Sequence, residues 1–211
     1  MFDIEYKGAN TVVISTKKAT IVTDPKLSVA GLKNVSIKGA VELATEARFA
    51  TNGPDADLLI EGPGEYGVDN FDILGIGAQR HLDAEGQELR GTIYRIKYGE
   101  VRIGLIGNIY ENLNDDQLEA LGVVDILIIP IGGNGYTLDS TGATSLIRKI
   151  SPKVVIPVHY ADSALKYEVA QDSLDTFVKE LGAPVETVSK YKLKGVMSLP
   201  TILTVVEISR S

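Results

Sequence analysis

Short runs of β-branched and aromatic residues, each bounded by turn-forming residues, dominate the first half of the sequence. Runs of this length are typical of β-strands, and the shortest separators between them are typical of antiparallel hairpins. Because so many strands follow one another before any helical pattern, a large β-sheet component is unavoidable. The predicted strands cover residues 2–6, 11–15, 19–23, 57–60, 71–76, 92–98 and 101–106.

The second half alternates helical patterns with apolar strands. Asn114 and Gln117 have the spacing of a capping box, and Asp139 can cap a second helix. Two strands, over residues 125–131 and 153–158, are apolar without alternation, as expected for strands that are covered on both faces. We therefore expect helices near residues 114–121, 139–150 and 172–181, and a final strand over residues 202–208 that could pair at a sheet edge with another copy of the chain.

Composition excludes several classes of protein. The 211 residues contain no cysteine, which excludes a disulfide framework, a thiolate nucleophile and cysteine-based metal sites. The formal net charge of −7 argues against nucleic acid as a partner. The first residues are acidic and no apolar run approaches a membrane span, so we expect a cytoplasmic protein without a membrane partner. No linker divides the chain, which we expect to be a single domain over residues 1–211.

The two histidines, His81 and His159, both stand at the ends of predicted strands. Strand ends are where α/β proteins often place functional side chains. His159 follows a buried strand and has Tyr160 and Asp162 beside it. A lone histidine in such a place is more often a hydrogen-bonded structural residue than a ligand, so neither residue defines a site by itself.

The order of six segments resembles the metallo-β-lactamase superfamily, and more narrowly its small predicted zinc-dependent hydrolases. The segments are YKGAN at 6–10, IVTDP at 21–25, EGPGEY at 61–66, GLIGN at 104–108, DILIIPIGG at 125–133 and IPVHY at 156–160. The resemblance implies an α/β fold of the αββα type, a four-layer sandwich with a metal site at one rim between the two sheets. This architecture agrees with the order of strands and helices predicted above.

The same resemblance implies that most metal ligands are absent. The family binds one or two zinc ions through an H-x-H-x-D-H motif, a later His, an Asp and a final His. His81 and His159 match histidine positions of the family, whereas Asn108 stands where a bridging Asp is expected. The places of the H-x-H-x-D-H ligands are taken by Thr45, Ala47, Phe49 and Ala50, and Ala9 replaces the His of an opening G-H pair.

We therefore expect a degenerate metal site, a pseudoenzyme that binds no metal and needs no cofactor. Its rim is predicted at Asp24, His81, Asn108 and His159, and is filled by side chains such as Arg48 and Phe49. No catalytic residue is assigned. The protein would act by binding another protein or a small-molecule ligand, or as a scaffold, and could form a homo-oligomer.

Two alternatives stay open at this point. In one, the chain is an altered metal-dependent hydrolase in which His81, His159 and a carboxylate hold one zinc ion; the candidate carboxylates are Asp24, Glu46 and Asp162. In the other, His159 performs metal-free acid–base catalysis with Asp24 or Tyr160, which requires a partner within about 3 Å and a perturbed pKa.

Overall fold

The strands form two sheets. The structure is a computed structural model, and it describes residues 1–83 and 88–211. One sheet contains β1 (Phe2–Gly8), β2 (Thr11–Ser15), β3 (Thr20–Thr23), β4 (Val41–Leu43), β5 (Leu58–Ile60) and β13 (Tyr191–Leu193). The other contains β6 (Gly64–Val68), β7 (Phe71–Ala78), β8 (Gly91–Tyr98), β9 (Val101–Leu105), β10 (Ile126–Pro130), β11 (Val154–Val158), β12 (Val185–Val188) and β14 (Thr204–Ile208).

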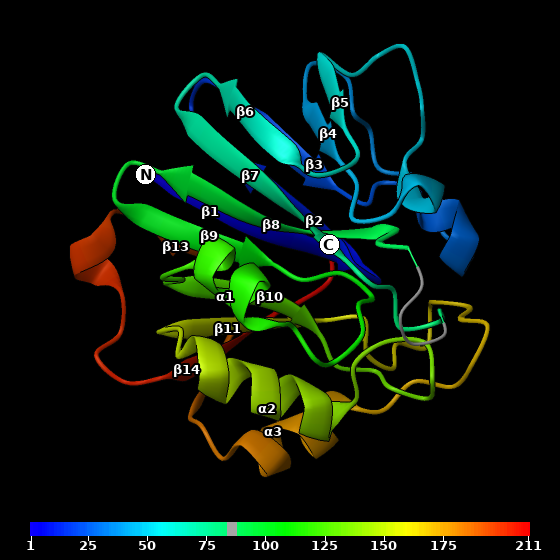
Figure 1. Cartoon of the computed structure of the whole chain (residues 1–211), viewed down its shortest axis with the longest axis vertical. Coiled ribbons are helices and arrows are strands. Elements are labelled where there is room, and N and C mark those ends of the chain that lie inside the picture. Colours follow the sequence, from blue (N-terminus) through cyan, green and yellow to red (C-terminus); the bar gives the residue numbers. More distant parts are fainter. Residues whose placement is uncertain (84–87) are drawn as a thin grey trace.

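Each sheet combines an antiparallel part with a parallel part (Figure 1). The six-stranded sheet has the order β13-β1-β2-β3-β4-β5, and only its β3-β4-β5 part is parallel. The eight-stranded sheet has the order β12-β14-β11-β10-β9-β8-β7-β6, and β6 to β9 form an antiparallel meander. The remaining strands of that sheet are parallel to β9, and parallel neighbours need crossover connections.

Three α-helices lie in these crossovers among the described residues. They are α1 (Asp115–Leu121), α2 (Ser140–Ile150) and α3 (Leu174–Leu181). The predicted capping box of Asn114 and Gln117 opens α1, and the Gly142 N–H donates to Asp139 Oδ1 over 2.7 Å at the start of α2. The third helix begins later than predicted because Ser173 is its N-cap, accepting from the Thr176 N–H.

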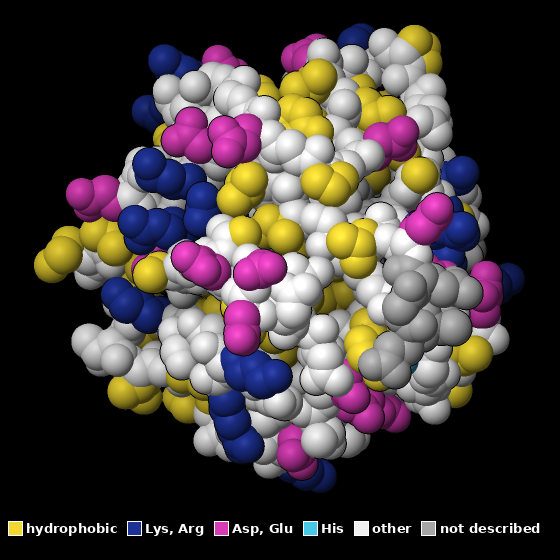
Figure 2. Space-filling view, viewed as in Figure 1, with side chains coloured by type: hydrophobic (Ala, Val, Ile, Leu, Met, Phe, Trp, Pro, Cys, Tyr) yellow, Lys and Arg dark blue, Asp and Glu magenta, His cyan; other side chains and the backbone are white. Residues whose placement is uncertain are grey.

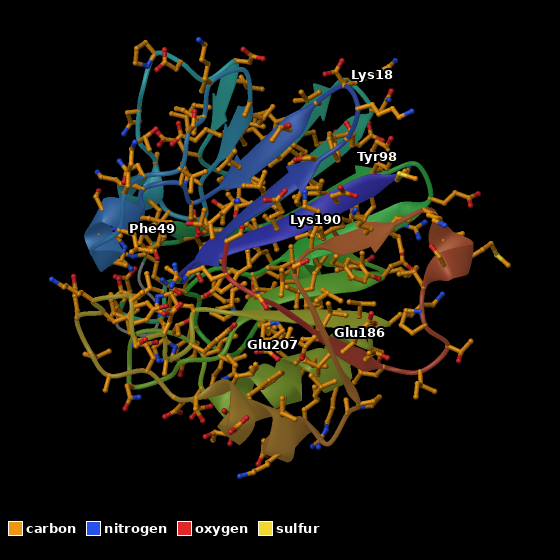
Figure 3. All side chains as sticks on the ribbon, turned by 180° about the vertical axis from the view of Figure 1, so that it is seen from behind. Lys18, Phe49, Tyr98, Glu186, Lys190 and Glu207 are labelled. Carbon is orange, nitrogen blue, oxygen red and sulfur yellow. The ribbon has the colours of Figure 1, made fainter. Side chains whose placement is uncertain are left out.

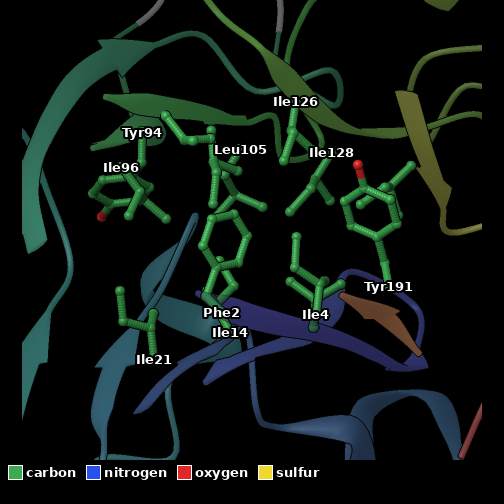
Figure 4. Packing of buried hydrophobic residues seen from close by; sticks show 14 of the residues in the cluster. Phe2, Ile4, Ile14, Ile21, Tyr94, Ile96, Leu105, Ile126, Ile128 and Tyr191 are labelled. Atoms are coloured by element: carbon green, nitrogen blue, oxygen red, sulfur yellow. The ribbon is translucent and has the colours of Figure 1, made fainter. Parts of the chain in front are cut away.

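The main core lies between the two sheets. In Figure 4, Phe2, Ile4 and Ile14 of the six-stranded sheet point toward the side chains of the facing sheet. A second core lies between the eight-stranded sheet and the helices. Strand β10 serves both cores, since Ile126 and Ile128 face the first and Leu127 and Ile129 face the second. This two-sided burial explains why β10 is apolar without alternation.

The outer layers are unequal. All three helices cover the eight-stranded sheet, as Figure 1 shows. The outer face of the six-stranded sheet is covered by a small apolar cluster of Val22, Ile37 and Ala40 instead, and the segment that supplies it carries only a 3₁₀-helix, η1 (Leu27–Ala30), in the described residues. The predicted α/β sandwich is confirmed, with this outer layer built of loop rather than α-helix.

The sequence did not predict all of the strands. Strands β4, β6, β12 and β13 were not predicted, because they are short or, in β6, carry two glycines in place of β-branched residues. The expectation that residues 202–208 form an edge was wrong. Strand β14 lies between β11 and β12, and the edges of its sheet are β12 and β6.

Within residues 1–83 and 88–211, none of the helices has the length and apolar character to cross a bilayer.

Candidate functional site

The four predicted rim residues follow four different strands and meet at one end of the sandwich. Asp24 follows β3, His81 and Asn108 come after β7 and β9, and His159 follows β11. The His81 N–H donates to the Asn108 carbonyl oxygen over 2.9 Å, and the Asn10 amide donates to Asn108 Oδ1 over 3.0 Å. Asn10 in turn lines one cavity with Asp24 and His159. The sequence therefore identified four residues that lie together in the structure.

The cavity at this rim is small. Its volume is about 20 Å³, which is room for about one water molecule. Besides Asn10, Asp24 and His159, three aromatic rings line it, those of Phe49, Tyr136 and Tyr167. Figure 3 places Phe49 at one end of the sandwich and Tyr98 at the other. An organic ligand would have to displace some of these side chains to enter.

Left-handed backbone conformations are concentrated at the cavity. Ala9, Asp24 and His159 line it with φ values of 46°, 42° and 51°. Residues with side chains rarely adopt this conformation, and it persists where surrounding contacts hold it. One such contact is the hydrogen bond from the His159 N–H to the Ala9 carbonyl oxygen, 2.8 Å long. The turn after β1 and the end of β11 are thereby fixed together.

Asp24 is buried, and both hydrogen bonds that its carboxylate accepts in the described structure come from Thr45. The Thr45 N–H donates to Asp24 Oδ1 and the Thr45 hydroxyl donates to Oδ2, both over 2.7 Å. Burial raises the pKa of Asp24 to about 7, against the lowering effect of the two Thr45 bonds. Thr45 also lies close to the backbone of Gly107, where an added Cβ would come within 2.6 Å of it. Both carboxylate oxygens are therefore engaged by a rigidly packed residue.

His159 is 3% exposed and held between aromatic rings. Its Nδ1 lies 3.0 Å from Gln171 Oε1, and its ring lies 5.5 Å from the Tyr136 ring and 4.7 Å from the Tyr167 ring. Burial lowers the pKa of His159 to about 4, so the imidazole is neutral near pH 7. Among the described contacts it has no hydrogen bond to Asp24 or Tyr160, the partners that acid–base catalysis would require.

Other candidates named from the sequence have different partners. The Tyr160 ring stacks on Tyr6 with centroids 5.8 Å apart, and Asp162 Oδ2 accepts from Arg210 over 2.5 Å. His81 Nδ1 is buried and has no hydrogen-bond partner within the described part of the chain. The same holds for Asn108 Nδ2. Such atoms call for an explanation, because buried polar atoms are nearly always bonded.

A charged cluster lies next to the cavity. Arg48 Nε is 2.8 Å from Glu46 Oε2, and an Arg48 Nη donates to Oε1 over 3.1 Å. Glu46, which is 4% exposed, also lies 3.5 Å from Arg80. Burial raises the pKa of Glu46, and the two arginines oppose that rise. The guanidinium of Arg48 lies 4.6 Å from the centroid of Phe49 and 5.1 Å from that of Tyr136.

No metal-binding group is formed by the part of the chain that the structure describes: nowhere in it do three or more histidine, aspartate or glutamate side chains gather in a way that could hold an ion. Sequence reasoning missed two residues that shape the rim, Gln171 and Tyr136. Both lie in loops that carry no local pattern. Their role follows only from the tertiary contacts with His159.

Comparison with known proteins gives curated relatives and solved structures. The chain is 32% identical over 146 residues to the UPF0173 metal-dependent hydrolase of Thermoplasma acidophilum. That match covers 58% of this chain and 63% of the relative, so less than two thirds of the relative's length is spanned.

The solved structures share the fold at low sequence identity. A candidate Zn-dependent hydrolase of the metallo-beta-lactamase superfamily from Thermotoga maritima has a TM-score of 0.77 and 21% identity, covering 99% of this chain and 100% of that one. Igni18, a metallo hydrolase of Ignicoccus hospitalis, has a TM-score of 0.63 and 16% identity, covering 86% and 90%. The family model described as a beta-lactamase superfamily domain matches residues 3–159, well over half of the chain, and the chain therefore belongs to that superfamily.

Proposed function

We propose that this chain is a metal-free member of the superfamily that acts by binding another protein or a small-molecule ligand, or as a scaffold, and does not hydrolyse a substrate. The observation that carries the proposal is that three of the possible metal-binding side chains at the rim, those of Asp24, His159 and Glu46, already have partners within the chain. Thr45 holds both oxygens of Asp24, Gln171 lies against His159 Nδ1, and Arg48 pairs with Glu46.

The donor set does not fit a divalent ion. Zinc normally takes three or four ligands from histidine, carboxylate or thiolate groups. The Asn108 amide is neutral, and the His159 ring lies between two tyrosine rings. Metal-dependent hydrolysis needs the bound ion to lower the pKa of the attacking water, so a rim that does not hold an ion lacks that chemistry.

The direct test is the metal content of untagged protein. Elemental mass spectrometry would be performed on the purified chain, and again after incubation with excess zinc or manganese followed by desalting. We expect far less than one metal per chain in both samples. Retention of one or more metal ions per chain would contradict the proposal. A histidine tag must be avoided because it adds ligands of its own.

A reduced one-metal hydrolase is the second candidate. It is favoured by the unpartnered, buried Nδ1 of His81 and by the name of the Thermoplasma relative. In that case His81→Ala and His159→Ala would each remove a bound metal and any phosphodiesterase or esterase activity, while His81→Gln would keep the side-chain volume without a strong ligand. Activity that is unchanged in both alanine variants would exclude this candidate.

The remaining expectations belong to the same proposal. They are a cytoplasmic location, a single-domain chain, the absence of nucleic-acid and membrane partners, and the capacity to form a homo-oligomer. On the face shown in Figure 2, acidic and basic side chains are interspersed over the helices and form no continuous basic surface there. Light scattering after size exclusion measures the oligomeric state directly.

A further inference from the structure

Arg48 connects several of the segments that meet at the rim. It lies in η2 (Ala47–Phe49), the 3₁₀-helix that follows β4. Its guanidinium contacts the rings of Phe49 and Tyr136, and the Tyr136 ring is stacked on His159 with an interplanar angle of 19°. One side chain therefore links the segment after β4 with the segment after β10 and, through Tyr136, with the end of β11.

The carboxylate of Glu46 extends this connection to a further segment. Glu46 pairs with Arg48 at 2.8 Å and with Arg80 at 3.5 Å, and Arg80 follows β7. Arg80 is itself fixed by Asp83, since its Nε donates to Asp83 Oδ2 over 2.8 Å. The segments after β4, β7 and β10 are thus joined by ion pairs and by contacts between cation and ring.

The chemistry of arginine suits this position. A guanidinium stays charged at every accessible pH and is weakly hydrated. The N–H groups at its edge can donate to a carboxylate while its planar face lies on aromatic rings. A buried carboxylate such as Glu46 is strongly destabilised without a cation beside it. Arg48 also acts on its wider surroundings, because its positive charge favours the ionised form of Asp24 and disfavours that of His159.

We propose that the guanidinium of Arg48 is the resident cation of this rim, neutralising Glu46 and cross-linking the segments after β4, β7 and β10. This inference rests on the proposed function, because it requires the native rim to be metal-free. The rim is then a built cation site whose occupant is covalently part of the chain. Emptied of that side chain, it should accept a free guanidinium ion.

Chemical rescue of Arg48→Ala in the full chain tests this. Thermal unfolding would be followed by circular dichroism with guanidinium chloride at a low millimolar, non-denaturing concentration, and with sodium chloride at the same concentration. We expect Arg48→Ala to lower Tm by about 5 °C or more. Guanidinium, but not sodium, should recover most of that loss, whereas the wild type should gain nothing from either salt.

Arg95→Ala is the matched control. Arg95 is likewise half-buried, but its guanidinium donates to the Ala120 carbonyl oxygen over 2.9 Å at the end of α1. Within the described residues, Arg95 makes no ion pair, and its guanidinium does not lie over an aromatic ring. Its replacement should lower Tm without recovery by guanidinium. Equal recovery of both variants would show a general salt effect and would overturn the inference.

Two further variants keep the test decisive if Arg48→Ala does not fold. Arg48→Lys retains the charge without the planar face, and Arg48→Met retains the length without the charge. We expect Tm to fall in the order wild type, Arg48→Lys, Arg48→Met. Equal Tm values for the two variants would contradict a role for the cation.

A failure of the resident-cation inference can be distinguished from a failure of the proposed function. Metal-free wild type together with an Arg48→Ala variant that guanidinium does not rescue would overturn only the resident-cation inference. Wild type that retains one metal per chain would overturn the proposed function, and the inference with it.

Discussion

Burial moves Asp24 and His159, which both line the rim cavity, toward their neutral forms. The pKa of Asp24 rises to about 7 and that of His159 falls to about 4, in each case chiefly because burial disfavours the charged state. Beside the cavity, the buried carboxylate of Glu46 is paired with Arg48. Because the pKa values of Asp24 and His159 differ between the folded and unfolded chain, their protonation changes the free energy of unfolding with pH.

The effect of Asp24→Asn on the free energy of unfolding should depend on pH. Because the folded-state pKa of Asp24 is about 7 and the ordinary pKa of an aspartate is 3.8, the folded chain holds this proton more tightly than the unfolded chain does. The contribution of Asp24 is complete below pH 3.8 and is lost as the pH rises to 7. Between pH 5 and pH 8, the free energy of unfolding of Asp24→Asn should therefore rise relative to wild type by about 2–3 kcal/mol.

Urea unfolding of both proteins at pH 5 and pH 8 measures this difference. The altered hydrogen bonding with Thr45 adds an offset, but that offset is the same at both pH values and cancels. A difference between variant and wild type that does not change with pH would show that Asp24 is ionised in the fold at both values.

His159 should titrate far below the ordinary range of histidine. Its folded-state pKa is about 4, whereas the ordinary pKa of a histidine is 6.5, so the unfolded chain binds this proton more tightly. The stability contributed by neutral His159 is present above pH 6.5 and is lost as the pH falls to 4. With only two histidines in the chain, proton NMR can follow each ring separately, and His159→Gln assigns the signals. A midpoint for His159 near pH 6.5 would contradict the burial described above.

Sequence reasoning located the rim residues but could not give their partners. Asp24, Asn108 and His159 were found because each follows a strand in a segment that resembles the family. His81 was found because it stands at a strand end and matches a histidine position of the family. That Gln171 bonds His159, or that Tyr136 lies on its ring, depends on how loops distant in sequence pack, and no local pattern encodes it. The engaged state of the rim was visible only in the structure.

At the scale of single elements, local chemistry predicted helices better than short strands. The caps of α1 and α2 were correct because a side chain within three residues decides each helix start. Strands β12 and β13 were missed because strands this short depend on their neighbours rather than on their own sequence. Strand β12, for example, pairs with β14 along its whole length although most of its residues are exposed.

The cap of α1 can be tested by Asn114→Ala. Asn114 Oδ1 accepts from the Gln117 N–H over 2.9 Å, and the Asn114 N–H donates to Gln117 Oε1 over 2.9 Å. Gln117 Nε2 also donates to the Gly77 carbonyl oxygen and so fixes α1 on β7. We expect a loss of about 1 kcal/mol in the free energy of unfolding, measured by urea titration. Glu119→Ala, on the exposed side of the helix, is the control and should change stability far less.

At the scale of the whole molecule, the family resemblance predicted that the two sheets pack on each other. It did not predict the hydrogen bonds that connect them. Tyr94 of β8 is fully buried, and its hydroxyl donates to the carbonyl oxygen of Ala44, which follows β4 in the other sheet, over 2.8 Å. The same hydroxyl accepts from the Gly62 N–H over 3.1 Å, where the chain passes from β5 to β6. One side chain thus connects the two sheets near the rim.

Tyr94→Phe should weaken this connection without changing the packing of the ring. The substitution leaves the Ala44 carbonyl and the Gly62 N–H without their shared partner, and a buried unsatisfied group costs about 1–3 kcal/mol. For a chain of this size, each kcal/mol corresponds to about 2–4 °C in Tm. Tyr98→Phe is the matched control, because Tyr98 lies on the same strand and packs on Phe71, but its hydroxyl has no hydrogen bond among the described contacts. Thermal unfolding that shows equal losses for the two variants would mean that the Tyr94 hydroxyl does not hold the sheets together.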